Sequence, residues 1–350
     1  MRHLWYKFFK EIVGIGLFFT LKKIIVYGEE NIPAKGAVLF IGNHENGLID
    51  SILIPLTTKR IMYFLSRASA FKNVLVSKLL YSLNMIPIYR IRDGVNTIEK
   101  NVAIFEQCFE ILRTGGTIEI FAEGEHHLDR RVLRLKKGFA RIILGTLQKY
   151  PETDIQIVPV GINYDHRLNF PASVSIYYGD PIYANDYFNL DDPDEQFTEI
   201  INEVSSALKE LTLHIEDTSN YETIIKQLEN NNVNYLDPFE ANALLETMDT
   251  SKVMSNDKKS QVNWFTPLHV IAKINSIIPL MIWRYIKSKI KEIIFTTTFR
   301  FAVITVLFPL FYIIQAAIVY YIFNLKYALF YLLCCIVLGM ISTKTMTVGK

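Results

Sequence analysis

Between residues 36 and 180, short apolar runs alternate with longer stretches in which apolar positions have helical spacing. Residues 95–112 and 138–147 show the helical spacing, and Gly115–Gly116 ends the first of these helices. Six apolar runs predict buried strands, over residues 37–42, 61–66, 86–89, 117–122, 155–163 and 174–178. The alternation predicts an α/β domain, in which helices flank a mixed, mostly parallel sheet.

An apolar run near the N-terminus lies between two pairs of lysines. It covers residues 12–21, fewer than the ~20 residues that a membrane-spanning helix needs. No small-residue cleavage site follows it, so a secretory signal is not expected. Aromatic side chains beside the lysines favour a helix in the membrane interface within residues 1–30, with an ordinary buried helix as the alternative.

The C-terminal part contains two apolar runs, residues 302–323 and 327–341. At ~1.5 Å per residue the first run extends ~33 Å, enough to cross a bilayer. The two runs predict a transmembrane hairpin over residues 301–343, and a single span plus a re-entrant segment is the alternative. Basic residues precede and follow the hairpin, whereas the link carries Lys326 alone. The positive-inside bias therefore places both ends and the α/β domain on the cytoplasmic side.

The stretch between the α/β domain and the hairpin changes character twice. Residues 186–250 are acidic with helical periodicity, and Lys209 and Lys226 are their only lysines or arginines. We interpret them as solvated helices that cover the sheet. Residues 251–300 begin as a polar linker and end as a basic amphipathic segment. The α/β domain is thereby expected within residues 31–185.

Composition narrows the function classes. Hydrophobic residues make up 50% of the 350 residues and charged residues 21%, and this balance argues against disorder. The hydrophobic share is also higher than that of an average soluble enzyme. Lys and Arg number 37 against 35 Asp and Glu, and the net charge of +2 gives no evidence of a nucleic-acid partner. Two of the three cysteines, Cys334 and Cys335, are adjacent in an apolar run, so neither a disulfide framework nor a zinc site is expected.

Two of four short blocks that carry candidate chemistry follow the first strands of the domain. Residues 43–50 contain His44 and Asp50. Asp50 is placed to accept a hydrogen bond from one imidazole nitrogen, which leaves the other nitrogen free as a base. Residues 85–90 form a strand that ends in Arg90. Its guanidinium suits a phosphate group, and a surface salt bridge is the alternative.

The other two blocks also lie on strands. Residues 121–127 contain Glu123 and Gly124 at a strand end and continue into a basic loop, which suits a hydroxylated and phosphorylated ligand. His126 and His127 beside glutamates raise the alternative of a metal site, but no third ligand has suitable spacing, so no metal is expected. Residues 157–161 are a buried strand with a proline and by themselves indicate only structure.

In this order the four blocks resemble the glycerolipid acyltransferase family, which includes 1-acylglycerol-3-phosphate and glycerol-3-phosphate acyltransferases. In that family a strand leads to Asn-His and a spaced Asp. A Pro-containing strand that ends in Arg, a Phe-Pro-Glu-Gly block and a Val-Pro strand then follow. The resemblance covers roughly residues 30–180 and implies that family's fold.

The resemblance also implies site residues and a mechanism. His44 corresponds to the general base and Asp50 to its orienting partner, Arg90 to a phosphate ligand, and Glu123 with Gly124 to part of the acceptor site. The implied reaction is direct transfer from acyl-CoA or acyl-carrier protein to a hydroxyl, with no cofactor besides the donor. The absence of a Gly-x-Ser-x-Gly motif agrees with a reaction that forms no acyl-enzyme.

The sequence departs from the family pattern at three points. Five residues separate the histidine and the aspartate, whereas four are usual, and one extra residue turns a side chain by ~100° around a helix. Ala122 stands where proline is usual, which we expect to be tolerated. His126 stands where arginine is usual, so it is a candidate acceptor ligand, and Arg130, Arg131 or Lys137 are candidates to replace the missing phosphate ligand.

The sequence therefore predicts a membrane-bound acyltransferase that acts on lysophosphatidate or glycerol 3-phosphate in phospholipid biosynthesis. Its expected partners are membrane lipids and the acyl carrier, and no nucleic acid. The alternatives are an acyltransferase for another lysophospholipid or an aminolipid, a hydrolase, and a catalytically silent lipid-binding homologue. The altered histidine–aspartate spacing is the feature that supports the silent homologue.

Overall fold

The structure is a computed structural model that describes residues 2–89, 97–248 and 263–347. Eight strands of these residues form one sheet in the order β1-β7-β6-β2-β5-β3-β4, with β8 paired to β6. β6 is antiparallel to β7 and β8, and all other pairs are parallel. The strands are β1 (Leu21–Tyr27), β2 (Ala37–Gly42), β3 (Met62–Arg67), β4 (Met85–Ile88), β5 (Thr117–Ile120), β6 (Ile155–Tyr164), β7 (Ala172–Tyr178) and β8 (Ile182–Tyr183).

All six expected strands are present, and the predicted mixed, mostly parallel sheet is confirmed. β1 and β8 were not expected. Residues 21–27 were assigned to the membrane-interface segment 1–30, but they form an edge strand parallel to β7. The reason is that an edge strand tolerates exposed lysines, and Lys22 and Lys23 lie within β1 rather than at the end of a helix.

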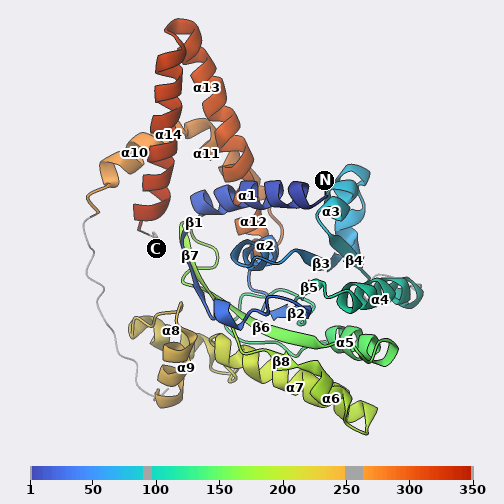
Figure 1. Ribbon diagram of the computed structural model, residues 1–350. Coiled ribbons are helices and arrows are strands. Elements are labelled where there is room, and N and C mark those ends of the chain that lie inside the picture. Colours follow the sequence, from blue (N-terminus) through green and yellow to red (C-terminus); the bar gives the residue numbers. More distant parts are fainter. Residues whose placement is uncertain (1, 90–96, 249–262, 348–350) are drawn as a thin grey trace.

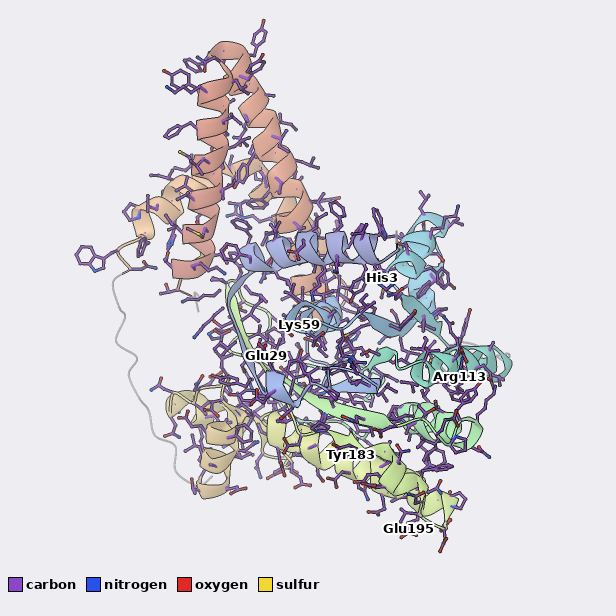
Figure 2. All side chains as sticks on the ribbon, in the orientation of Figure 1. His3, Glu29, Lys59, Arg113, Tyr183 and Glu195 are labelled. Carbon is purple, nitrogen blue, oxygen red and sulfur yellow. The ribbon has the colours of Figure 1, made fainter. Side chains whose placement is uncertain are left out.

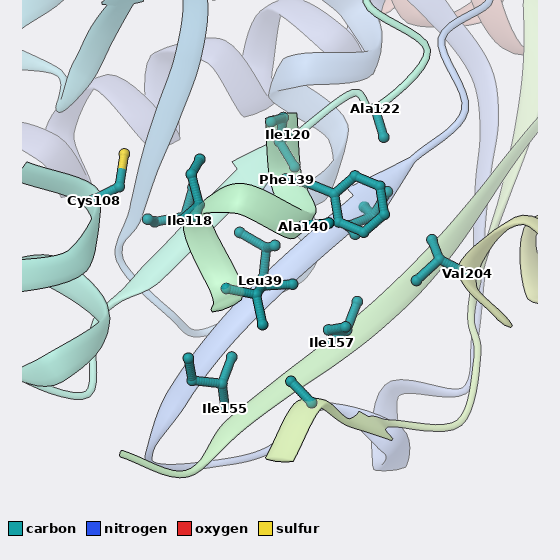
Figure 3. Packing of buried hydrophobic residues seen from close by; sticks show 14 of the residues in the cluster. Leu39, Cys108, Ile118, Ile120, Ala122, Phe139, Ala140, Ile155, Ile157 and Val204 are labelled. Carbon is teal, nitrogen blue, oxygen red and sulfur yellow. The ribbon is translucent and has the colours of Figure 1, made fainter. Parts of the chain in front are cut away.

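Helices cover both faces of the sheet (Figure 1). On one face, Leu17 of α1 (Arg2–Thr20) and Leu53 of α2 (Gly47–Thr57) pack on β2, β6 and β7 in one buried cluster. On the other face lie α4 (Thr97–Arg113), α5 (Gly138–Lys149), α6 (Ala184–Phe188) and α7 (Pro193–Leu211). Figure 3 shows this second core, where Phe139 and Val204 meet Leu39 and Ile157 of the central strands. The helices expected at residues 95–112 and 138–147 correspond to α4 and α5.

The acidic segment divides into two parts. α7 covers the sheet as expected, with Ile200, Val204 and Leu208 fully buried. By contrast, α8 (Tyr221–Asn230) and α9 (Pro238–Thr247) form a small cluster with a core of their own. This cluster is joined to β7 where Ser175 Oγ donates a hydrogen bond to the Leu236 carbonyl at 2.6 Å.

Two C-terminal helical stretches, Ile293–Ile322 and Leu325–Thr345, are long and apolar enough to cross a membrane. The first comprises η4 (Ile293–Phe295), α12 (Thr296–Ala302), η5 (Val303–Leu307) and α13 (Phe308–Ile322), and the second is α14 (Leu325–Thr345). α10 (Thr266–Asn275) and α11 (Ile277–Lys289) meet at 81° and are long enough together for a broken span. The expected polar linker over residues 251–261 lies outside the described residues.

The hairpin of α13 and α14 projects away from the sheet, and α1 lies across its base (Figures 1 and 2). The base is packed into the domain rather than tethered to it. Phe301 belongs to the same buried cluster as Leu17 and Phe40, and Thr343 Oγ1 donates a hydrogen bond to the Phe19 carbonyl at 2.9 Å. Two short helices, η1 (Glu29–Asn31) and η2 (Ala68–Phe71), and α3 (Val74–Ser82) complete the described elements.

Candidate active site

His44 and Asp50 meet at the end of β2. His44 lies in the loop between β2 and α2, and Asp50 lies in the first turn of α2. The His44 Nδ1 atom is 3.0 Å from Asp50 Oδ2, and the aspartate side chain is fully buried. With Nδ1–H donating to the carboxylate, Nε2 of the neutral ring carries a lone pair and no proton. The pair has the arrangement that a general base requires.

Two more hydrogen bonds fix the Asp50 carboxylate. The Asn46 backbone N–H donates to Oδ2 at 2.6 Å, and the Tyr164 hydroxyl donates to Oδ1 at 2.7 Å. Burial, and then the charge of Asp50, raise the pKa of Tyr164 well above its ordinary value, so its hydroxyl keeps the proton that it donates. Sequence reasoning missed Tyr164, which ends the strand that carries the fourth block.

The extra residue between His44 and Asp50 is taken up before the helix begins. α2 starts at Gly47, whose φ of +37° bends the chain so that Asp50 still faces the histidine. A Cβ atom at Gly47 would lie 3.2 Å from Thr298 Oγ1 and 3.4 Å from the Phe295 ring. Both the backbone and the neighbours therefore favour glycine at this turn.

The third block is brought to His44 by the order of the strands. β2 and β5 are parallel neighbours, so the residues that follow them meet at one edge of the sheet. The His44 ring stacks on Phe121, with ring centroids 4.1 Å apart and planes 15° apart. The edge of the His126 ring approaches at a centroid distance of 5.4 Å. The structure thus places His126 beside His44, and its role as an acceptor ligand stays a prediction.

Glu123 is buried behind this group. One of its oxygens, Oε2, lies 3.0 Å from His127 Nε2, and the His127 backbone N–H donates to the His44 carbonyl at 3.3 Å. Burial lowers the pKa of His127, but the hydrogen bond and charge of Glu123 outweigh burial, so the pKa is raised overall. The other oxygen, Oε1, has no hydrogen-bond partner among the described residues. Gly124, with φ +72°, turns the chain after Glu123.

These positions lie in the part of the chain that resembles known proteins. Residues 23–163 match the family model described as Acyltransferase. The chain carries an acyltransferase domain. The predicted resemblance to acyltransferases is thereby confirmed for this part of the chain.

Two curated relatives show how far the similarity extends. Glycerol-3-phosphate O-acyltransferase 1 of Saccharomyces cerevisiae is 32% identical over 127 residues, which are 35% of this chain and 16% of the yeast protein. The 1-acyl-sn-glycerol-3-phosphate acyltransferase of Borreliella burgdorferi is 28% identical over 134 residues, 38% of this chain and 51% of that protein. The chain thus spans about one sixth of the yeast relative and half of the bacterial one.

A solved structure, the 1-acyl-sn-glycerophosphate acyltransferase PlsC from Thermotoga maritima, is 21% identical. The match covers 60% of this chain and 81% of that chain, with a TM-score of 0.44.

Glu45 of the acyltransferase domain points into a buried charge network, away from the base. Its Oε2 atom lies 3.5 Å from Arg167 Nε. Burial raises the pKa of Glu45, and the positive charges of Arg167 and Arg130 oppose the rise. Arg130 donates to the Tyr164 carbonyl at 3.0 Å and lies 3.6 Å over the Tyr235 ring. Arg130 is therefore engaged in the fold and is a poor replacement for a phosphate ligand.

Two predicted phosphate ligands, Arg90 and Lys137, and the possible metal site remain to be placed. Arg90 lies outside the described residues. The Lys137 ammonium lies 5.8 Å over the ring of Phe197 on α7, and none of the described contacts joins it to His44 or Glu123. The structure thus places the Lys137 side chain beside α7, and its role as a phosphate ligand stays a prediction. In the described ranges no three His, Cys, Asp or Glu side chains are grouped as metal ligands.

The segment that enters the first apolar span borders the site. His126 Nε2 is 4.0 Å from Glu292 Oε2, and its ring centroid is 5.1 Å from that of Phe295. We call residues 292–300 the entry segment. Sequence reasoning treated it as the end of a basic amphipathic segment, although three consecutive threonines before the span, Thr296–Thr298, were an available signal.

The entry segment also contacts residues 45–49, which we call the His44–Asp50 turn. Thr297 Oγ1 donates a hydrogen bond to Asn46 Oδ1, and Thr298 Oγ1 accepts one from the Leu48 backbone N–H at 3.3 Å. A guanidinium nitrogen of Arg300 donates to the Leu168 carbonyl at 2.8 Å. The residues between His44 and Asp50 are therefore held by the segment that leads into the first long apolar helix.

Proposed function

We propose that the protein is a membrane-bound O-acyltransferase of glycerolipid synthesis, with His44 as the general base. The acceptor hydroxyl loses its proton to His44 Nε2 and attacks the carbonyl carbon of an acyl thioester. An ester C–O bond forms, the C–S bond breaks, and the proton passes to the departing thiolate. The hydrogen-bonded His44–Asp50 pair within the acyltransferase domain is the observation that carries the proposal.

The geometry counts against a catalytically silent homologue. That alternative depended on the long spacing between histidine and aspartate, and Asp50 nevertheless reaches His44 Nδ1. The donor in this proposal is acyl-CoA or acyl-carrier protein, because a direct transfer needs an activated thioester and the chain supplies no nucleophile elbow.

Lysophosphatidate or glycerol 3-phosphate is the first candidate acceptor, which the names of the relatives support. The surroundings of His126 favour a second candidate. A histidine replaces the usual arginine there, and the Glu292 carboxylate lies 4.0 Å away. A carboxylate beside the acceptor site repels a phosphomonoester and attracts a cationic group. A lysophospholipid or aminolipid with an amine in its headgroup is therefore the alternative acceptor.

Membrane attachment in this proposal has two parts. The hairpin supplies the spans, and α1 lies at its base with an exposed apolar face that includes Leu4, Phe8 and Ile15, which are 55–72% exposed. Arg284, Lys287 and Lys289 lie on α11 before the first span, whereas Lys326, in the first turn of α14, is the only lysine or arginine at the opposite end of the hairpin. This distribution supports a catalytic domain on the cytoplasmic side.

The test is acyl transfer by the full-length protein in detergent or lipid nanodiscs. Labelled long-chain acyl-CoA and acyl-carrier protein are each paired with glycerol 3-phosphate, lysophosphatidate and amine-bearing lysolipids. We expect acylated product from the wild type, and His44→Ala to lower the rate by ~10²–10⁴. His166→Ala is the matched control, because this histidine is exposed in a neighbouring loop.

Absence of product from folded protein with every donor and acceptor would reject the proposal. Loss of thioester without acylated lipid would instead identify a hydrolase.

A further inference from the structure

A cleft of about 240 Å³ lies between α7 and the basic loop that follows the third block. Arg131 and Arg134 line one side, and Ser205 and Lys209 of α7 line the other. α7 covers the sheet face opposite α1 and α2, and α7 and the hairpin lie at opposite ends of the molecule (Figure 1). Figure 2 marks the far end by Glu195 on α7. A ligand therefore reaches this cleft from water and not from the bilayer.

The cleft is lined by basic side chains, although the segment that contains α7 is acidic. Lys209 is one of only two basic residues between positions 187 and 249, and it faces two arginines across the cleft. Across the described ranges, no carboxylate lies within 4.0 Å of the charged nitrogens of Arg131, Arg134 or Lys209. Glu216 is the one carboxylate in the wall. Three unpaired cations repel one another, and a bound anion relieves that repulsion.

His214 adds a neutral hydrogen-bond donor to the wall. Its Nδ1 atom accepts the Val132 backbone N–H at 3.0 Å, so the neutral ring carries its proton on Nε2. Burial, and then the charge of Lys209, lower the pKa of His214 and favour this neutral form. The described hydrogen bonds give Nε2 no protein acceptor. With the Ser205 hydroxyl, the cleft combines two neutral donors with three cations.

We propose that this cleft binds the phosphate groups of a water-soluble ligand. A planar guanidinium grips two phosphate oxygens at once, an ammonium adds a point charge, and neutral N–H and O–H groups complete the anion's hydrogen bonds. The cleft is smaller than the pockets that enclose a whole drug-sized ligand, so it suits a small phosphate ester or the phosphate-bearing end of a larger molecule.

Two sources share this chemistry. One is the nucleotide end of an acyl-CoA donor, which rests on the proposed function. Arg130, next to Arg131, donates to the Tyr164 carbonyl, and the Tyr164 hydroxyl donates to Asp50, so few residues separate the cleft from the base. The other source is a free phosphate or phosphate ester that binds without taking part in the reaction.

The first experiment measures binding to the full-length protein in detergent by calorimetry, with adenosine 3′,5′-bisphosphate and with inorganic phosphate as probes. We expect binding that weakens with salt, and a loss on the order of tenfold for Lys209→Ala or Arg134→Gln. Lys226→Ala and Arg141→Gln are matched controls outside the cleft and should change affinity less than twofold. Absence of binding, or equal losses in the controls, overturns the proposal. Melting curves exclude variants that fail to fold.

The second experiment separates the sources by steady-state kinetics. If the acyl-CoA donor occupies the cleft, Lys209→Ala raises KM for the donor on the order of tenfold and leaves kcat unchanged. If free phosphate is the ligand, phosphate binding is lost while KM stays the same. Both results uphold the anion site and identify its source. The calorimetric arm needs no turnover, so failure of the proposed function is distinguishable from failure of this inference.

Discussion

Tyr164 provides a sharp test of how the base is held. Asp50 is fully buried and accepts three hydrogen bonds, from His44 Nδ1, the Asn46 N–H and the Tyr164 hydroxyl. Tyr164→Phe removes one donor and leaves Asp50 Oδ1 without that bond. A hydrogen bond to a buried charged group contributes ~1.5–3 kcal/mol. We expect the free energy of unfolding in detergent to fall by about that amount.

The effect on catalysis should pass through Asp50. A carboxylate that has lost one of its donors orients His44 less firmly, so we expect kcat to fall on the order of tenfold. This loss is smaller than the ~10²–10⁴ loss expected for removal of the general base. KM should change little, because the hydroxyl is committed to Asp50. The assay is acyl transfer under saturating donor and acceptor, with kcat and KM determined separately.

Tyr178→Phe is the matched control, because Tyr178 is also buried in this core but its hydroxyl bonds Thr57 Oγ1 at 2.7 Å. It should lose ~0.5–1.5 kcal/mol of stability and keep its kcat. A double-mutant cycle with Asp50→Asn decides the reasoning. Tyr164→Phe should lower kcat far less in that background. Equal losses in both backgrounds would refute the idea that Tyr164 acts through Asp50.

Three further predictions concern the surroundings of the base. Thr297→Val should lower kcat with little change in KM, because it removes the hydrogen bond to Asn46. Thr297→Ser keeps the hydroxyl and should restore the rate. Equal kcat values for the wild type and both variants would show that this bond is dispensable. Phe301→Ala should destabilise the catalytic core by ~3–5 kcal/mol, and denaturant titrations that show no change would separate the hairpin base from that core. The raised pKa of His127 means that its ion pair with Glu123 stabilises the fold below the unfolded pKa of ~6.5 and is lost as pH rises through the folded value. Stability curves from pH 5 to 9 should lose this slope in Glu123→Gln, and a slope that persists would assign it to another group.

Strands that are buried on both faces were predictable because continuous apolar runs bounded by turns leave few alternatives. β2 and β6 are of this kind, and every residue of β2 is buried. β1 was missed because it lies at the sheet edge, where its lysines are tolerated and interrupt the apolar pattern. β8 has only two residues, which is too short for any periodicity.

Some contacts of the candidate site could be predicted from the sequence and others could not. His44 and Glu123 follow neighbouring parallel strands, so their approach follows from strand order and was predictable. Tyr164 and Thr297 were not, because their partners lie 114 and 251 positions away in the sequence. Only tertiary packing brings such pairs together, and one sequence carries no local signal for them.

The contacts of the entry segment determine when, during translation, the candidate active site can form. The ribosome makes the His44–Asp50 turn early, but the threonines that hold it belong to the helix that continues into the first long apolar stretch. The nascent chain therefore completes the contacts of the His44–Asp50 turn only after most of the 350 residues have been translated and that helix has formed. We expect a chain ending at residue 291 to transfer no acyl groups, and full activity from it would contradict this order of events. Such timing confines the proposed acyl transfer to chains whose C-terminal apolar helices have already been made.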